Sequence, residues 1–72
     1  MNAPNPALDA QRLFESRCWF SPFLRERAER ALFSIQALTA AGDCGAARVW
    51  RDALSIDLEH DIKFEQVCTQ PR

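Results

Sequence analysis

The chain has 72 residues, of which 47% are hydrophobic, and a formal net charge of −1. A chain of this length forms one domain at most, and its stability is marginal unless oligomerisation, a metal or disulfides add to it. The hydrophobic fraction excludes a disordered chain, and the charge near zero gives no general attraction to nucleic acid or to anionic membranes.

The cysteines and the apolar segments bear on the cellular compartment. No basic segment followed by an apolar run opens the sequence, and no apolar stretch approaches the roughly 20 residues that span a bilayer. Cys18, Cys44 and Cys68 are widely spaced and odd in number, so they indicate neither a zinc site nor a disulfide framework. We therefore expect a cytoplasmic protein with no membrane partner.

Residues 1–18 are predicted to form a flexible arm followed by a short helix. Residues 1–7 contain two prolines and two asparagines, which is typical of a flexible arm. A first helix is expected over about residues 8–18, with Asp9 in its first turn, where a carboxylate favours the positive helix end. This helix should end before Pro22, because proline disfavours helical geometry in the residue that precedes it.

The second helix has clear start and stop signals. Ser21 is the expected N-cap, Pro22 the first helical residue and Gly42 the stop. Apolar residues at spacings of four and three form its predicted core stripe, which is Leu24, Ala28, Ala31, Ile35 and Leu38. Phe33 lies nine residues after Leu24 and therefore on the opposite side of the helix. So short a chain has little material to cover both sides, and we expect another element, a second copy or a partner to meet Phe33.

Asp43 is the expected N-cap of a third helix, which would form an antiparallel hairpin with the second. Its predicted inward face consists of Ala46, Val49, Trp50, Ala53 and Leu54. Asp57 and Asp61 would fall inside this stripe, and because unpaired carboxylates are seldom buried, we expect a break near residues 55–57. Beyond the break, alternating polarity favours a strand, and a short helix is an equal alternative.

The fold class that follows is mainly all-α. We expect a helical hairpin or a three-helix domain over residues 8–68, with a flexible C-terminus at residues 69–72.

Catalysis is not expected. His60 is the only histidine, and although it lies among acidic residues, a solvated acidic face explains this segment better than a metal site. Gly42 and Gly45 lack the rest of any nucleotide fingerprint, and Cys44 is expected to be a small apolar residue in the turn. We therefore predict no catalytic, cofactor-binding or metal-binding residue.

Nucleic-acid binding is not expected either. The short turn between two helices invites a helix-turn-helix interpretation, but that motif needs apolar residues where Arg48 and Arg51 fall. Acidic residues are also interleaved with the arginines, as on a solvated mixed face. A small DNA-binding regulator remains an alternative, which would require Arg48 and Arg51 to contact DNA.

The aromatic residues carry the preferred interpretation. We expect Phe20 and Trp50 in the core, because aromatic side chains dominate burial in small domains, and a partner contact for Trp19 and Phe33. The preferred function is a non-enzymatic interaction module, an adaptor or inhibitor, that binds a partner protein or a second copy through an aromatic and aliphatic helix face. The candidate partner-binding residues are Trp19, Phe23, Arg30, Phe33, Ala37, Asp57, Glu59 and Asp61.

Two further alternatives stay open. Residues 52–65 are strongly acidic and contain a single base, Lys63, which favours a small phage or mobile-element inhibitor that imitates nucleic acid. The helix, glycine turn and helix between Leu24 and Leu54 resemble the small co-chaperones of bacterial secretion systems, and this resemblance implies a co-chaperone role.

Overall fold

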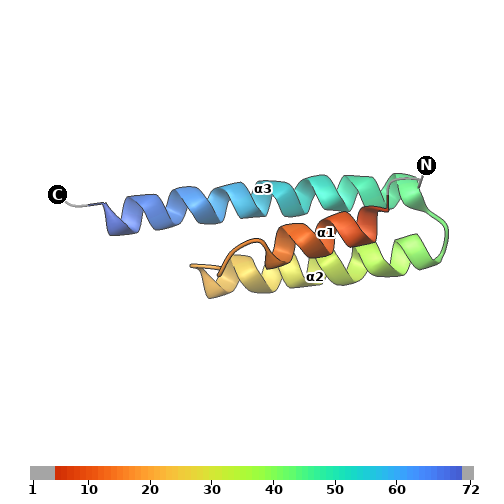
Figure 1. Ribbon diagram of the computed structural model, residues 1–72, viewed down its shortest axis with the longest axis horizontal. Helices are drawn as coiled ribbons and strands as arrows, with labels where there is room; N and C mark the ends of the chain where they lie inside the picture. Colours follow the sequence, from red (N-terminus) through yellow and green to blue (C-terminus); the bar gives the residue numbers. More distant parts are fainter. Residues whose placement is uncertain (1–4, 71–72) are drawn as a thin grey trace.

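The computed structural model describes residues 5–70, and these form three helices and no strand. The helices are α1 (Pro6–Glu15), α2 (Pro22–Ala40) and α3 (Cys44–Thr69). The chain runs along α1, back along α2 and forward again along α3, so that α2 and α3 form an antiparallel hairpin with α1 beside it (Figure 1). The prediction of a small all-α domain is confirmed. Of the two alternatives for the C-terminal segment, a strand or a short helix, the strand is wrong, since those residues are helical.

α1 begins two residues earlier than expected. The Asn5 side chain accepts hydrogen bonds from the backbone N–H groups of Ala7 (3.0 Å) and Leu8 (3.3 Å), and a proline follows Asn5, as at many helix starts. The helix ends at Glu15, three residues before the expected end, where the Ser16 hydroxyl donates to the Leu13 carbonyl over 2.6 Å. Residues 1–4 of the predicted arm, and residues 71–72 of the predicted C-terminus, lie outside the described residues.

The turn between α2 and α3 forms as the sequence predicts. Gly42 has a φ of +84°, its N–H donates to the Thr39 carbonyl (3.1 Å), and the Asp43 N–H donates to the Leu38 carbonyl (2.9 Å). This pair of bonds is the Schellman motif that ends helices at a left-handed glycine. The Asp43 side chain then accepts from the Ala46 N–H over 3.2 Å and caps α3.

Two glycine substitutions should therefore have opposite effects on stability. Gly42→Ala is expected to lower the free energy of unfolding by about 1 kcal/mol, because the left-handed conformation strains any residue with a Cβ atom although no heavy atom lies within 4 Å. Gly45→Ala, inside the first turn of α3, should raise it by about 0.5 kcal/mol, because alanine loses less backbone entropy in a helix. Urea unfolding followed by circular dichroism measures both. An unchanged or raised stability of Gly42→Ala would contradict the role of the turn.

The core is narrow and built mainly from alanine. The fully or nearly fully buried apolar residues are Ala10, Ala28, Ala31, Ile35, Ala47 and Leu54. The small side chains let the three helices approach closely, and Ile35 and Leu54 are the largest apolar side chains that are fully buried. The predicted stripe of α2 is confirmed, because its members are buried or half-buried.

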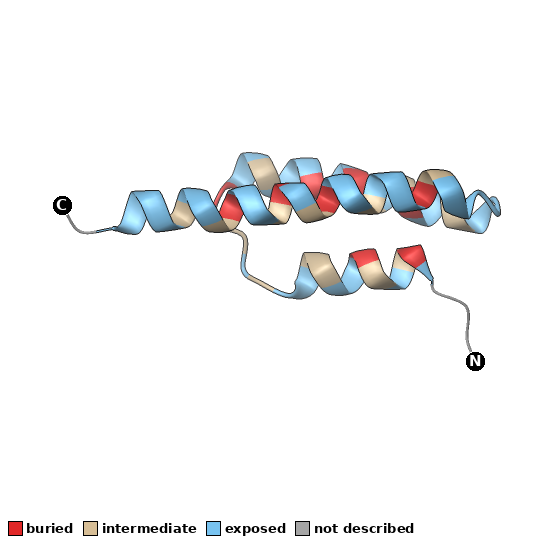
Figure 2. Ribbon diagram, turned by 90° about the horizontal axis from the view of Figure 1, so that it is seen from above, coloured by how far each residue is buried: buried red, intermediate tan, exposed pale blue. Residues whose placement is uncertain are grey.

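α3 differs most from the prediction, because it continues without a break through residues 55–57. Asp57 and Asp61 are buried, as an uninterrupted helix requires, but both are paired with arginines. The inward face is also rotated from the predicted one: Ala47 and Leu54 are buried, whereas Val49 is 69% exposed. Figure 2 shows the buried residues where the helices face one another, and exposed residues along the outside.

The two hairpin helices differ in length. With a rise of about 1.5 Å per residue, the 26 residues of α3 span about 39 Å and the 19 residues of α2 about 28 Å. The C-terminal turns of α3 consequently extend past the start of α2 (Figure 1). Phe64 on this extension contacts Phe20 edge-to-face, with ring centroids 5.6 Å apart.

Candidate functional site

The outer face of α2 exposes two phenylalanine rings. Phe23 is 70% exposed and Phe33 is 74% exposed, whereas Ala28 and Ile35 on the other side of the helix are fully buried. The prediction that Phe33 lies opposite the core stripe is confirmed. The two rings are ten residues apart, which corresponds to about 15 Å along the helix axis.

Charged side chains occupy the helix surface between the rings. Arg30 pairs with Glu26 over 3.0 Å, and both side chains are largely exposed. Glu26 and Arg30 line two shallow hollows, one of which also includes Phe23 and the other Phe33. Ala37, two turns after Arg30, is exposed and continues the face. We call Phe23, Glu26, Arg30, Phe33 and Ala37 the α2 outer face.

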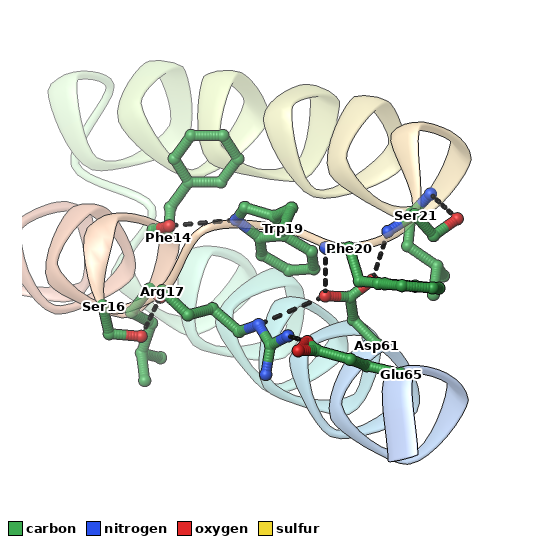
Figure 3. Close-up of polar contacts among 10 residues, drawn as sticks. Phe14, Ser16, Arg17, Trp19, Phe20, Ser21, Asp61 and Glu65 are labelled. Carbon is green, nitrogen blue, oxygen red and sulfur yellow. Dashed lines mark hydrogen bonds and ion pairs between the residues drawn. The ribbon is translucent and has the colours of Figure 1, made fainter. Parts of the chain in front are cut away.

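Trp19 does not belong to the α2 outer face. Its ring packs against Phe14, with centroids 5.7 Å apart, and its indole N–H donates to the Phe14 carbonyl over 3.0 Å (Figure 3). The ring also packs against the buried core residues. The tryptophan therefore closes the loop between α1 and α2.

The prediction that Phe20 and Trp50 lie in the core is wrong. Phe20 remains 40% exposed and Trp50 remains 45% exposed. Alanines at the helix contacts bring the backbones too close together to admit a large ring between them.

Asp61 ties the loop between α1 and α2 to α3. Its two carboxylate oxygens accept hydrogen bonds from the backbone N–H groups of Phe20 (2.9 Å) and Ser21 (2.8 Å), as Figure 3 shows. The Nε atom of Arg17 lies 3.2 Å from the same carboxylate, and the guanidinium also pairs with Glu65. The side chain of Asp61 is fully buried, so it cannot present its charge to a partner.

Asp57 is also directed inward. Its side chain is 7% exposed and lies 3.4 Å from the Nε atom of Arg27 on α2. Glu59, in contrast, is exposed. The structure therefore separates the three acidic candidates: one carboxylate faces solvent and two hold the helices together. Of the five acidic residues within 52–65, Asp57 and Asp61 are therefore withdrawn from the surface.

The arginines of α3 lie in mixed surroundings. Arg51 is near Asp9 on α1 (3.8 Å) and Asp52 (3.3 Å), and α2 runs antiparallel beside α3 rather than crossing it as in a helix-turn-helix motif.

Among residues 5–70, no three histidine, cysteine or acidic side chains are grouped so that they could hold a metal ion. Cys18, Cys44 and Cys68 are free and exposed thiols.

Comparison with protein-family models, curated proteins and solved structures finds no match for this chain. Within residues 5–70, none of the helices combines the length and the apolar character required to cross a bilayer.

Sequence reasoning missed two groups of residues. Arg17 and Arg27, which pair with the buried carboxylates, carry no local signal, because their partners are 44 and 30 residues away in the sequence. The second group is Val49, Ile56 and Val67, which are exposed on α3, and for these a signal existed. Their spacing by seven and eleven places them on one side of an uninterrupted helix, but the expected break at residues 55–57 hid this pattern.

Proposed function

We propose that this chain is a non-enzymatic protein-interaction module that binds a partner protein through the α2 outer face. The observation that carries the proposal is the exposure of Phe23 and Phe33 on the side of α2 that faces away from the core. Exposed apolar side chains that share one face mark interaction sites, and interface centres are enriched in aromatic residues and arginine. The three exposed free thiols favour a reducing compartment, and we place the module in the cytoplasm.

The chemistry of the face restricts the partner. Two rings spaced by about 15 Å along the helix axis, with an exposed Arg30–Glu26 pair between them, suit an apolar surface with charged groups of both signs at its centre. A partner that offers two apolar pockets and one carboxylate would bury both rings and exchange the weak Arg30–Glu26 pair for an intermolecular one.

Replacing Phe33 with aspartate should abolish partner binding and leave the fold intact. A buried aromatic anchor commonly contributes 2 kcal/mol or more, which corresponds to about a thirtyfold loss of affinity. The tagged chain and the Phe33→Asp variant would be used to capture proteins from lysate of the source cell, with quantitative mass spectrometry as the readout.

Ile56→Asp is the matched control, because it places the same charge at an exposed apolar position on α3. A protein captured in one-to-one amount by the native chain and by Ile56→Asp, but not by Phe33→Asp, is the expected result. Equal capture by Phe33→Asp, with an unchanged circular dichroism spectrum, would refute a role for the α2 outer face.

A further inference from the structure

The outer side of α3 carries a second row of apolar side chains, which face away from the other two helices. Val49 is 69% exposed, Ile56 52% and Val67 73%, and Figure 2 shows exposed residues along most of the length of α3. The row belongs to a series of positions at alternating spacings of three and four, namely 46, 49, 53, 56, 60, 63 and 67. Apolar residues occupy five of these seven positions, which approximates the heptad pattern of a helix that packs against another helix.

The core alone is small for a domain of this size. Of the six buried apolar residues, four are alanines, whereas nine large apolar side chains among residues 5–70 are exposed. Small domains with few buried aliphatic residues are commonly stabilised by oligomerisation. A helix that packed on α3 would bury Val49, Ile56 and Val67 at once.

We propose that the outer face of α3 pairs with the same face of a second copy of this chain, in antiparallel orientation, about a two-fold axis at the level of residue 58. A two-fold axis brings residues equally distant from it into contact, so the surface must be complementary to itself. Counted outward from residue 58, the matched positions are Ile56 with His60, Ala53 with Lys63, and Val49 with Val67.

These matched positions are complementary in size. The valines meet at both ends of the interface, and the small Ala53 side chain leaves room for the long Lys63 chain of the second copy. Near the axis, Ile56 of one copy packs against the imidazole ring of His60 of the other copy. Each contact occurs twice because of the symmetry, so a few favourable pairs along one helix suffice to build the interface.

The charge of Lys63 favours the antiparallel orientation over the parallel one. Antiparallel pairing brings the ammonium group of Lys63 next to Asp52 of the second copy, whose side chain is 69% exposed and, among residues 5–70, pairs with its neighbour Arg51 alone, over 3.3 Å. Such an exposed pair contributes little and is readily exchanged. Parallel pairing would instead place Lys63 against Lys63 and His60 against His60, which disfavours that orientation.

The length of the face is adequate for weak, reversible dimerisation. Residues 46–67 span about 32 Å of helix axis, most of the 49 Å length of the molecule. A standard interface buries about 800 Å² per partner, about a seventh of the 5370 Å² that the chain exposes. Glu59 flanks the axis in both copies, and its carboxylate must stay in water. This limits how tightly the two helices pack near the axis, so we expect a dissociation constant in the micromolar range.

Sedimentation equilibrium of the full chain, from low to high micromolar concentration, tests the proposal. The expected result is a reversible monomer–dimer equilibrium that Ile56→Asp weakens at least tenfold and that Phe33→Asp, on the α2 outer face, leaves unchanged. A monomer at every concentration would overturn the proposal. So would a dimer that Ile56→Asp leaves intact, because that dimer would use another face.

A charge exchange tests the orientation. Asp52→Lys alone should weaken the dimer, because it places a lysine next to Lys63 of the second copy, and Asp52→Lys combined with Lys63→Asp should restore it. Failure of the double variant to restore the dimer, with native helix content, would overturn the antiparallel arrangement. These measurements need no partner protein, so their outcome is independent of the function proposed for the α2 outer face.

Discussion

An Asp61→Ala variant is expected to lose about 3 kcal/mol of unfolding free energy, because alanine cannot accept the two N–H groups that the carboxylate satisfies. The N–H groups of Phe20 and Ser21 would be left without their acceptors in a partly buried loop, and Arg17 would lose one of its two carboxylates. Single domains have about 0.05–0.15 kcal/mol of stability per residue, or about 4–11 kcal/mol for this chain. The substitution would therefore remove a large share of the total.

Urea unfolding followed by circular dichroism measures the effect, at a protein concentration low enough to keep the chain monomeric. Glu59→Ala is the matched control, since it removes an exposed carboxylate two residues earlier on the same helix and should change the stability by no more than about 0.5 kcal/mol. Asp61→Asn should lie between the two, because its amide oxygen can accept one of the two N–H groups. A loss in Asp61→Ala no larger than that in Glu59→Ala would show that the loop is held by other contacts.

The contrast between α2 and α3 shows which parts of the fold the sequence could predict. The caps of α2 involve residues within a few positions of one another, such as Ser21 with Leu24 and Gly42 with Thr39. Local signals of this kind determined both ends of the helix and its buried stripe.

The course of α3 depended on contacts that no local pattern reveals. An aspartate in an apolar stripe argues for a break only if nothing pairs with it, and Asp61 is paired with the loop about 40 residues earlier in the chain. The wrongly predicted break also concealed which side of α3 faces the other helices. In a helix that ends near residue 55, the apolar residues on either side of Trp50 could equally form the buried face. Two carboxylates four residues apart inside an apolar stripe, in a chain rich in arginine, are better interpreted as sites of buried ion pairs.

The candidate site could be predicted only in part, because local patterns do not reveal contacts between residues that are distant in the sequence. Phe33 and Ala37 follow from the period of a single helix, and the structure exposes both. The prediction for Trp19, Asp57 and Asp61 rests on their chemical type, and the structure directs these side chains toward the other helices. Residue type alone did not separate a binding residue from one that holds the fold together.

The second large effect is expected for Leu54→Ala, which should lower the unfolding free energy by about 3 kcal/mol. Leu54 is fully buried and is one of the two large aliphatic side chains in a core otherwise made of alanine. Deleting a buried leucine side chain loses its transfer free energy and leaves a cavity, and such changes cost about 2–5 kcal/mol. Four of the six buried apolar residues are alanines, which have no side-chain rotamers with which to fill the cavity, so we expect limited relaxation around it.

Leu8→Ala is the control, because it deletes the same atoms from a position on α1 that is 46% exposed, and a loss below about 1 kcal/mol is expected. Unfolding in urea at matched protein concentrations gives both values, and the difference between the two variants isolates the contribution of burial. If both substitutions had the same small effect, Leu54 would not anchor the contact between α2 and α3. The stability of the chain would then reside mainly in the ion pairs of Asp57 and Asp61, and the combined variant Leu54→Ala with Asp61→Ala would be no less stable than Asp61→Ala alone.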